Sequence, residues 1–280
     1  MKKLYYIAVL IVFIICKEQI VVNGVTALDL WSSKLFPLLF PTFILADFLL
    51  SSDIPNFITA KLGGLYEKIF RVNRYGLFVF IVSMIAGTPT NAKMLYELNK
   101  NNVISDNDVT KILGHSILFN PFLIVSYGGI KLLIVFWISN ILTGVLMRGF
   151  NSDVINNTYT YFKFRFNLND SINKNVTILL NILGTITFFS CLIGVIPFSN
   201  IYVRYFFISF LEVTNAISFC SNFLNNNLML LALALSVGSF SIFIQIKSIL
   251  KDTSINFKYI LISRLICACI CESLIKCLAT

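Results

Sequence analysis

Long apolar runs separated by short polar stretches are the dominant pattern of this chain. A membrane-spanning helix needs roughly 20 consecutive apolar residues. Runs of about this length predict spanning helices over residues 4–22, 27–51, 130–148, 176–198 and 257–278. Further apolar runs are shorter or interrupted, and they cover residues 75–87, 112–129, 201–213 and 228–246. The pattern therefore predicts an all-α, polytopic membrane protein.

The first apolar runs carry signals of their own. Two lysines precede the run at 4–22, as in a signal peptide, but no small-residue cleavage site follows it. We therefore expect a signal-anchor helix within residues 1–25, with its amino terminus in the cytoplasm. Pro37 and Pro41 should kink the second run. Residues 54–74 place Lys and Arg between apolar positions at helical spacing, which predicts an interfacial amphipathic helix on the cytoplasmic leaflet, two spans after the amino terminus.

The same three residues interrupt two apolar runs. The stretch AGTPTNAKML follows one run, and FLEVTNAISF ends another, with the Thr-Asn-Ala triplets 124 residues apart. Around each triplet come a span, a short apolar run, the polar break, an interrupted run and a final span. This order predicts two membrane repeats, 26–150 and 176–280, joined by a polar linker at 151–175. Residues 93–112 are interpreted as an amphipathic or exposed segment, with a helix N-cap in SDND at 105–108.

The polar breaks need a physical reason in so apolar a chain. In hydrocarbon every backbone N–H and C=O must be paired, so a helix breaks only inside protein or beside a water-filled cavity. Sequence repeats with broken or re-entrant helix pairs are typical of transporters, in which the breaks form the substrate site near the midplane. Freed backbone groups and nearby polar side chains can then face a solute. The candidate substrate-binding residues are Thr88, Pro89, Thr90, Asn91, Asn120, Glu212, Thr214, Asn215, Ser239, Ser241 and Gln245.

Several polar residues have a structural alternative. Serines in membrane helices often bond a carbonyl one turn back, which is the alternative for Ser239. A carboxylate at membrane depth is costly and marks a functional site by default, but Glu212 has a salt bridge with Arg204 as its alternative. A lone histidine is more often a packing residue than a proton relay, and we expect this of His115. Lys93 is expected to reach an interface by snorkelling rather than to bind solute.

Composition narrows the class of protein. The chain is 57% hydrophobic and 12% charged, whereas soluble domains carry about 25% charged residues. Its net charge of +9 fits basic cytoplasmic loops, and no nucleic-acid-binding motif accompanies it. Seven cysteines without a CxxC pair and a single histidine predict no metal site. No catalytic constellation is present, so we expect neither an enzyme nor a cofactor.

Five segments resemble the YlbJ-type sporulation integral membrane proteins, which carry the nucleoside-recognition or Gate domain. They are LWSSKLFPLLFPTFILADFLL, RYGLFVFIVSMIAGTPTNAKMLYEL, SILFNPFLIVSYGG, FLEVTNAISF and VGSFSIFIQIKSIL, in the family's order over residues 27–275. They resemble, in turn, the family's L-W…VFPSLLPF-like helix, its G-Y-P-x-G-A-K break, its N-P-x-F stretch, its E-x-T-N-G element and its F-G-G-x-S-V element. Thr88, Asn91 and Ser239 depart from the usual Tyr, Gly and Gly, so the substrate is expected to differ where these positions form the pocket.

The resemblance implies a repeat architecture like that of the concentrative nucleoside transporters, and a role of sporulation members in moving dipicolinic acid. Lys34, Lys93 and Arg204 near the breaks favour an anionic solute. We therefore expect a transporter of a small anionic solute, dipicolinate-like or nucleoside-like, working by alternating access in the cell membrane or a forespore membrane. Its expected partners are lipid and solute, with a homo-oligomer left open, as is coupling to Na⁺ or H⁺. The alternative function is a non-transporting assembly or scaffold protein.

Overall fold

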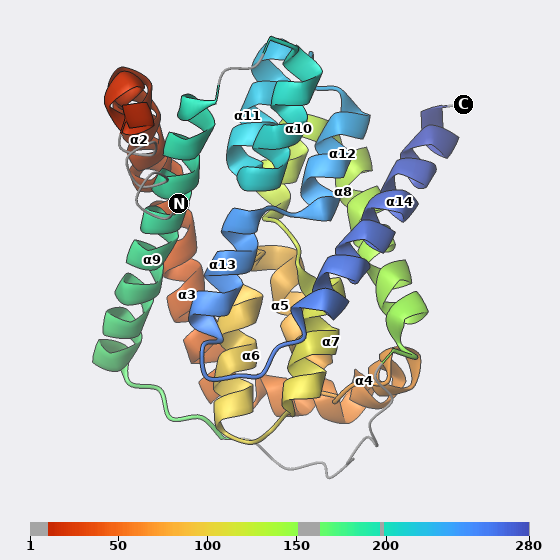
Figure 1. Cartoon of the computed structure of the whole chain (residues 1–280). Helices are drawn as coiled ribbons and strands as arrows, with labels where there is room; N and C mark the ends of the chain where they lie inside the picture. Colours follow the sequence, from red (N-terminus) through yellow and green to blue (C-terminus); the bar gives the residue numbers. More distant parts are fainter. Residues whose placement is uncertain (1–10, 151–162, 197–198, 280) are drawn as a thin grey trace, which may run out of the picture.

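The computed structural model describes residues 11–150, 163–196 and 199–279, which are helical apart from short connections (Figure 1). Four helical stretches within them are long and apolar enough to cross a membrane. They are Lys17–Ser51, Pro121–Met147, Leu168–Val195 and Leu228–Ile249. The predicted span at 257–278 is the helix α14 (Phe257–Ala279), which carries Lys258, Arg264, Glu272 and Lys276 and is not among the four. The prediction of an all-α, polytopic membrane protein is confirmed.

Within the described residues one helix runs from Lys17 to Ser51, so the predicted gap between the spans at 4–22 and 27–51 is not present. This helix runs through α2 (Lys17–Leu30), a π-helical turn η1 (Trp31–Leu35) and α3 (Phe36–Ser51). In the wide η1 turn the Phe36 N–H reaches the carbonyl of Trp31, and Pro37 follows at the start of α3, where its missing N–H is tolerated. Residues 1–10 of the predicted signal anchor lie outside the described residues.

The helix α4 (Ile54–Phe70) confirms a helix in the basic 54–74 segment and lies across one end of the molecule (Figure 1). We call this end, at the bottom of Figure 1, the α4 end. The start of α2 lies at the opposite end, so one helix separates them. From the start of α2 onward, one long helix rather than two spans precedes residues 54–74.

The first set of broken helices comprises α5 (Gly76–Ala86), α6 (Thr90–Lys100), α7 (Asp106–Ser116) and α8 (Pro121–Met147). The polar break at residues 87–89 separates α5 from α6, and residues 117–120 separate α7 from α8. Gly129, with φ of 72°, kinks α8 at the predicted Gly128-Gly129 interruption. Ser105 caps α7, because its hydroxyl accepts the Asp108 N–H at 3.1 Å, as the SDND pattern predicts.

The second set comprises α10 (Ile201–Leu211), α11 (Val213–Phe223), α12 (Leu228–Val237) and α13 (Phe240–Ile249), followed by α14. Glu212 divides α10 from α11, and Gly238 with Ser239 divides α12 from α13. The two sets point in opposite directions. The helices α5 and α6 extend from the α4 end to the break between them, whereas α10 and α11 extend to theirs from the opposite end (Figure 1).

Two segments differ from the predicted organisation. Residues 93–112, expected to be amphipathic or exposed, form most of α6 and α7, in which one face is buried between other helices while residues 100–102 and 105 are exposed. The linker predicted at 151–175 ends earlier, because α9 (Leu168–Val195) begins at Leu168 with Asn167 as its cap. Residues 151–162 of that linker lie outside the described residues.

The hydrophobic core is divided in two. One large core joins α4–α8 with α10–α14. A smaller core, built around Phe43, Leu179 and Ile186, joins α2–α3 to α9 alone. The long helices α2–α3 and α9 therefore form a pair that packs along one side of the two sets. The broken ends of the helices in both sets face this pair.

Candidate functional site

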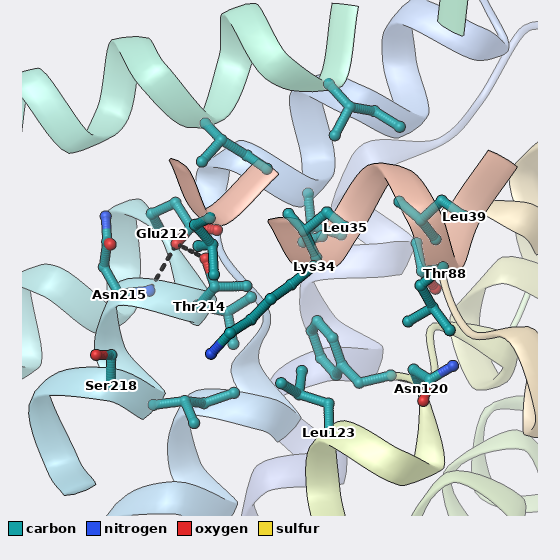
Figure 2. Close-up of a pocket in the computed structure, with 18 of the residues that line it drawn as sticks. Lys34, Leu35, Leu39, Thr88, Asn120, Leu123, Glu212, Thr214, Asn215 and Ser218 are labelled. Atoms are coloured by element: carbon teal, nitrogen blue, oxygen red, sulfur yellow. Dashed lines mark hydrogen bonds between the residues drawn. The ribbon is translucent and has the colours of Figure 1, made fainter. Parts of the chain in front are cut away.

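A cavity of about 340 Å³ lies where the breaks meet the long helix pair (Figure 2). Its walls come from α2–η1–α3, from both breaks of the first set, from the α10–α11 break, from α13 and from α9. Most of the lining is apolar. Seven predicted binding residues line it, namely Thr88, Pro89, Asn120, Glu212, Thr214, Asn215 and Gln245. Residues far apart in sequence therefore converge on one cavity.

The first-set wall is built from two breaks in contact. Gly87 adopts φ of 80°, and a Cβ there would lie 2.7 Å from the backbone nitrogen of Asn120. The Thr88 N–H donates to the carbonyl of Leu118 at 2.6 Å, which ties the two breaks together. Asn120 caps α8, its Oδ1 accepting the Phe122 N–H at 2.9 Å. The Thr88 hydroxyl is buried and has no hydrogen-bond partner in the described part of the chain.

The second-set wall is the amino terminus of α11. Glu212 is 1% exposed, and one of its carboxylate oxygens accepts the Asn215 N–H at 2.7 Å and the Thr214 hydroxyl. The Asn215 side chain donates in turn to Ser190 of α9 at 2.7 Å. The predicted alternative, a salt bridge to Arg204, does not form, because the Arg204 guanidinium lies over the Phe219 ring. Glu212 thus serves as the N-cap of α11, a position at which the helix dipole favours a carboxylate.

Lys34 brings a cation into the cavity. It lies in the η1 turn, midway along the 35-residue helix, and lines the cavity. Its side chain extends toward the side where Thr214 and Ser218 lie (Figure 2). The ion pairs of the described residues are Arg74–Glu67, Lys93–Asp47 and Lys174–Glu97, so Lys34 has no carboxylate partner among them. The sequence marked Lys34 as a nearby cation, but only the fold places it in the site.

Four predicted binding residues do not line the cavity, namely Thr90, Asn91, Ser239 and Ser241. Asn91 is fully buried, and its amide donates to the Ser116 carbonyl at 2.6 Å. Ser239 caps α13, and Ser241 accepts a bond from the Gln245 amide at 3.0 Å. Asn91 and Asn215, which recur in register in the sequence, therefore differ in surroundings. The Asn91 side chain bonds the end of α7 away from the cavity, whereas Asn215 lines the cavity.

Lys93 and His115 are both buried. Lys93 is 2% exposed and pairs with Asp47 at 2.5 Å, so the prediction that it snorkels to an interface is wrong. His115 bonds to the Tyr66 hydroxyl at 2.6 Å and to the Lys111 carbonyl at 2.9 Å. It also stacks on Phe70, with ring centroids 4.6 Å apart. His115 is therefore a packing residue with satisfied nitrogens, as expected.

The arrangement can enclose a small molecule against apolar walls, with Lys34 and the Thr88 hydroxyl as donors. A volume of 340 Å³ lies within the range of small-molecule sites. Among the described residues no group of three or more His, Cys, Asp or Glu side chains is placed to hold a metal ion.

Comparison with known proteins gives one similarity. No family model matches the chain, and no solved structure matches it. Over 135 residues it is 31% identical to the sporulation integral membrane protein YlbJ of Bacillus subtilis (strain 168). The match covers 45% of this chain and 33% of that protein, so it spans about a third of the relative's length. The similarity confirms the resemblance drawn from the sequence, and the chain is a multi-pass membrane protein similar to the YlbJ-type sporulation integral membrane proteins.

Proposed function

We propose that this protein carries a small anionic solute across the membrane by alternating access at the cavity between its broken helices. The observation that supports the proposal most directly is Lys34, a cation without a carboxylate partner among the described residues, in a cavity lined by the tips of oppositely directed helix sets. A lysine at the middle of a spanning helix is costly in lipid and is retained where it faces a polar cavity or a ligand.

The charges of the cavity favour an anion over a cation. The carboxylate of Glu212 is already compensated by the Asn215 N–H, the Thr214 hydroxyl and the start of α11. The ammonium of Lys34 has no such compensation from a described carboxylate. A solute carboxylate would therefore supply the missing partner, while the apolar walls would cover a flat ring. Both features fit a dipicolinate-like solute better than an uncharged nucleoside.

Alternating access follows from the opposed directions of the two sets. Each set contributes a break to the same cavity but reaches it from a different end of the molecule (Figure 1). Movement of the sets against the α2–α3 and α9 pair would open the cavity toward one end and then the other. Inverted arrangements of this kind underlie alternating access in many secondary transporters.

Uptake by proteoliposomes tests the proposal. Labelled dipicolinate and labelled uridine would be offered to the wild type, to Lys34→Gln and to Lys276→Gln, a control on the exposed face of α14. We expect dipicolinate uptake that falls at least about tenfold in Lys34→Gln, the effect of losing one charge-assisted bond. The control should match the wild type. Absence of flux for either solute would favour the scaffold alternative, and equal flux in Lys34→Gln would refute the role of Lys34.

A further inference from the structure

The segment Ile117–Asn120, between α7 and α8, forms part of the cavity wall through Phe119 and Asn120. A helix that ends leaves its last carbonyls without intrahelical partners, and water cannot supply them inside a membrane protein. The carbonyls at the end of α7 were expected to turn toward a solute. They are instead bonded to other parts of the protein.

Arg264 of α14 supplies two of these bonds. Its guanidinium donates to the Gly114 carbonyl at 2.5 Å and to the Ile117 carbonyl at 3.2 Å. It also donates to Oδ1 of Asn140 in α8 at 3.0 Å. The Asn140 amide is itself fixed, because it donates to the Phe136 carbonyl at 2.8 Å. One side chain thus joins α7, the break and α8.

Two further bonds hold this region from the break between α5 and α6. The Asn91 amide donates to the Ser116 carbonyl at 2.6 Å, and the Thr88 N–H donates to that of Leu118 at 2.6 Å. Together with Arg264, these bonds engage the carbonyls of residues 114, 116, 117 and 118. The segment is held between the first break and α14.

The local packing allows a guanidinium to reach this place. A Cβ on Gly114 would lie 2.7 Å from the Tyr259 ring, so only a glycine lets α14 approach α7 this closely. Arg264 is 1% exposed, and no described carboxylate forms an ion pair with it. Its charge faces the carboxyl end of α7, where the helix dipole is negative. A buried charge is costly, and anchoring α14 alone would not need one.

We propose that Arg264 is a positioning residue that holds the break Ile117–Asn120 and thereby sets Phe119 and Asn120 in the cavity wall. The claim about the break stands on these contacts alone. Its consequence for the solute rests on the proposed function. Arg264 itself does not line the cavity.

Hydrogen–deuterium exchange of the full chain in detergent micelles tests the local claim. The variants are Arg264→Met, which removes all donors, and Arg264→Lys, which keeps the charge but not the fork that spans two carbonyls. Tyr259→Phe is the matched control, because it removes a bond from α14 to the Met147 carbonyl without touching the break. In Arg264→Met we expect exchange to rise about tenfold or more in peptides over residues 84–92 and 117–124.

The controls separate positioning from simple anchoring. A residue that only anchors α14 would raise exchange in residues 257–271 and leave 84–92 and 117–124 unchanged, which would overturn the proposal. If Arg264→Met does not fold, Arg264→Lys carries the test, with an intermediate rise expected in the same peptides. In the Arg264 variants, exchange over residues 201–223 should match the wild type. In Tyr259→Phe, exchange over residues 84–92 and 117–124 should match the wild type.

Dipicolinate uptake then tests the consequence for the solute. We expect Arg264→Lys to raise the concentration for half-maximal uptake at least about fivefold while the folded fraction stays near that of the wild type. If exchange rises in the variants but neither they nor the wild type transports dipicolinate, the positioning role stands and the carrier function is refuted. Flux unchanged in a variant with faster exchange would refute the link between the break and the site.

Discussion

At the scale of single residues, the buried charges away from the cavity determine how firmly the helices hold together. Lys93 donates to Asp47 at 2.5 Å and to the Phe43 carbonyl at 2.9 Å. The other oxygen of Asp47 accepts from Ser171 and from Asn175. The pair therefore links α6 to α3 and α9, with almost every polar atom of Asp47 and Lys93 engaged. Removing one partner would leave the other charge buried and uncompensated.

Asp47→Ala is expected to lower the free energy of unfolding by about 3–5 kcal/mol, because Lys93 would remain buried without its counter-charge. The double variant Asp47→Ala/Lys93→Met should recover most of that loss. Lys174→Ala is the comparison, since Lys174 is about half exposed and its bond to Glu97, which is itself buried, is 3.3 Å long. It should cost less than Asp47→Ala, because water at the Lys174 end of the pair screens the charge that remains on Glu97. Denaturant unfolding in micelles measures all three, and equal losses for Asp47→Ala and Lys174→Ala would contradict the argument.

Two glycines at helix interruptions have positive φ angles that other residues rarely adopt. Gly87, with φ of 80° and ψ of −176°, and Gly129, with φ of 72° and ψ of 178°, occupy a region open almost only to glycine. Gly129→Ala meets no atom within 4 Å and should cost roughly 1–3 kcal/mol from strain alone. Gly87→Ala should cost more, because its Cβ would also meet Asn120. Thermal unfolding of the two variants measures the loss of stability in each. An equal loss would show that the backbone at Asn120 moves aside for the added Cβ at little cost.

At the scale of elements, the sequence predicts where helices break better than what the breaks contact. Proline, Asn-Pro and paired glycines are local signals, so the interruptions at Pro89, Asn120-Pro121 and Gly128-Gly129 are found correctly. The sequence did not predict the continuity of the helix over Lys17–Ser51, because the η1 turn that accommodates Pro37 leaves no local signal.

Contacts between distant segments could not be predicted in this way. Arg264 meets Ile117 across 147 residues, and Asp47 and Lys93 lie on helices whose packing no periodicity specifies. For the same reason Asn91 was grouped with Asn215. The triplet match identifies equivalent positions along the chain but not the side of the break to which each amide turns. Seven of eleven candidate residues nevertheless line one cavity, because they flank breaks that the fold brings together.

The helix α4 has an exposed face that suits the membrane interface. Ile54, Phe57, Leu62 and Leu65 are exposed on it beside Lys61 and Lys68. Its other face, which includes Tyr66 and Phe70, packs into the large core. An exposed apolar face with flanking lysines is typical of a helix that lies in the headgroup region.

Depth-dependent fluorescence quenching tests the position of α4. We expect a tryptophan introduced by Phe57→Trp to be quenched most by lipids brominated near the headgroup, because α4 lies across the end of the molecule. The comparison is Leu180→Trp, on the exposed face of the spanning helix α9, which should be quenched most by bromine deep in the acyl chains. Quenching is taken as the difference from the wild type. Deep quenching at position 57 would contradict an interfacial helix.

At the scale of the whole molecule, the two ends differ in charge. The α4 end holds α4, the loop 101–105 and the loop 250–256, which meets the α6–α7 region through the bond from Thr253 to Asn99 at 3.0 Å. Basic residues gather on these elements and beside them, namely Lys61, Lys68, Arg71, Arg74, Lys100, Lys247, Lys251 and Lys258. The opposite end holds fewer among the described residues, namely Lys17 at the start of α2, Arg204 in the first turn of α10 and Lys276 near the end of α14. Since Lys and Arg concentrate on cytoplasmic loops, the α4 end is expected to face the cytoplasm.

Labelling of single cysteines in intact cells tests this orientation, in a variant whose seven native cysteines are replaced by alanine. Asn101→Cys and Asp252→Cys are expected to resist a membrane-impermeant maleimide until the cells are opened, because both lie at the α4 end. Asn222→Cys, exposed in the last turn of α11, should react from outside. If positions 101 and 222 were labelled from the same side, the opposed arrangement of the two helix sets would be wrong. If all three positions reacted in the reverse order, the arrangement would hold and only the orientation would be inverted.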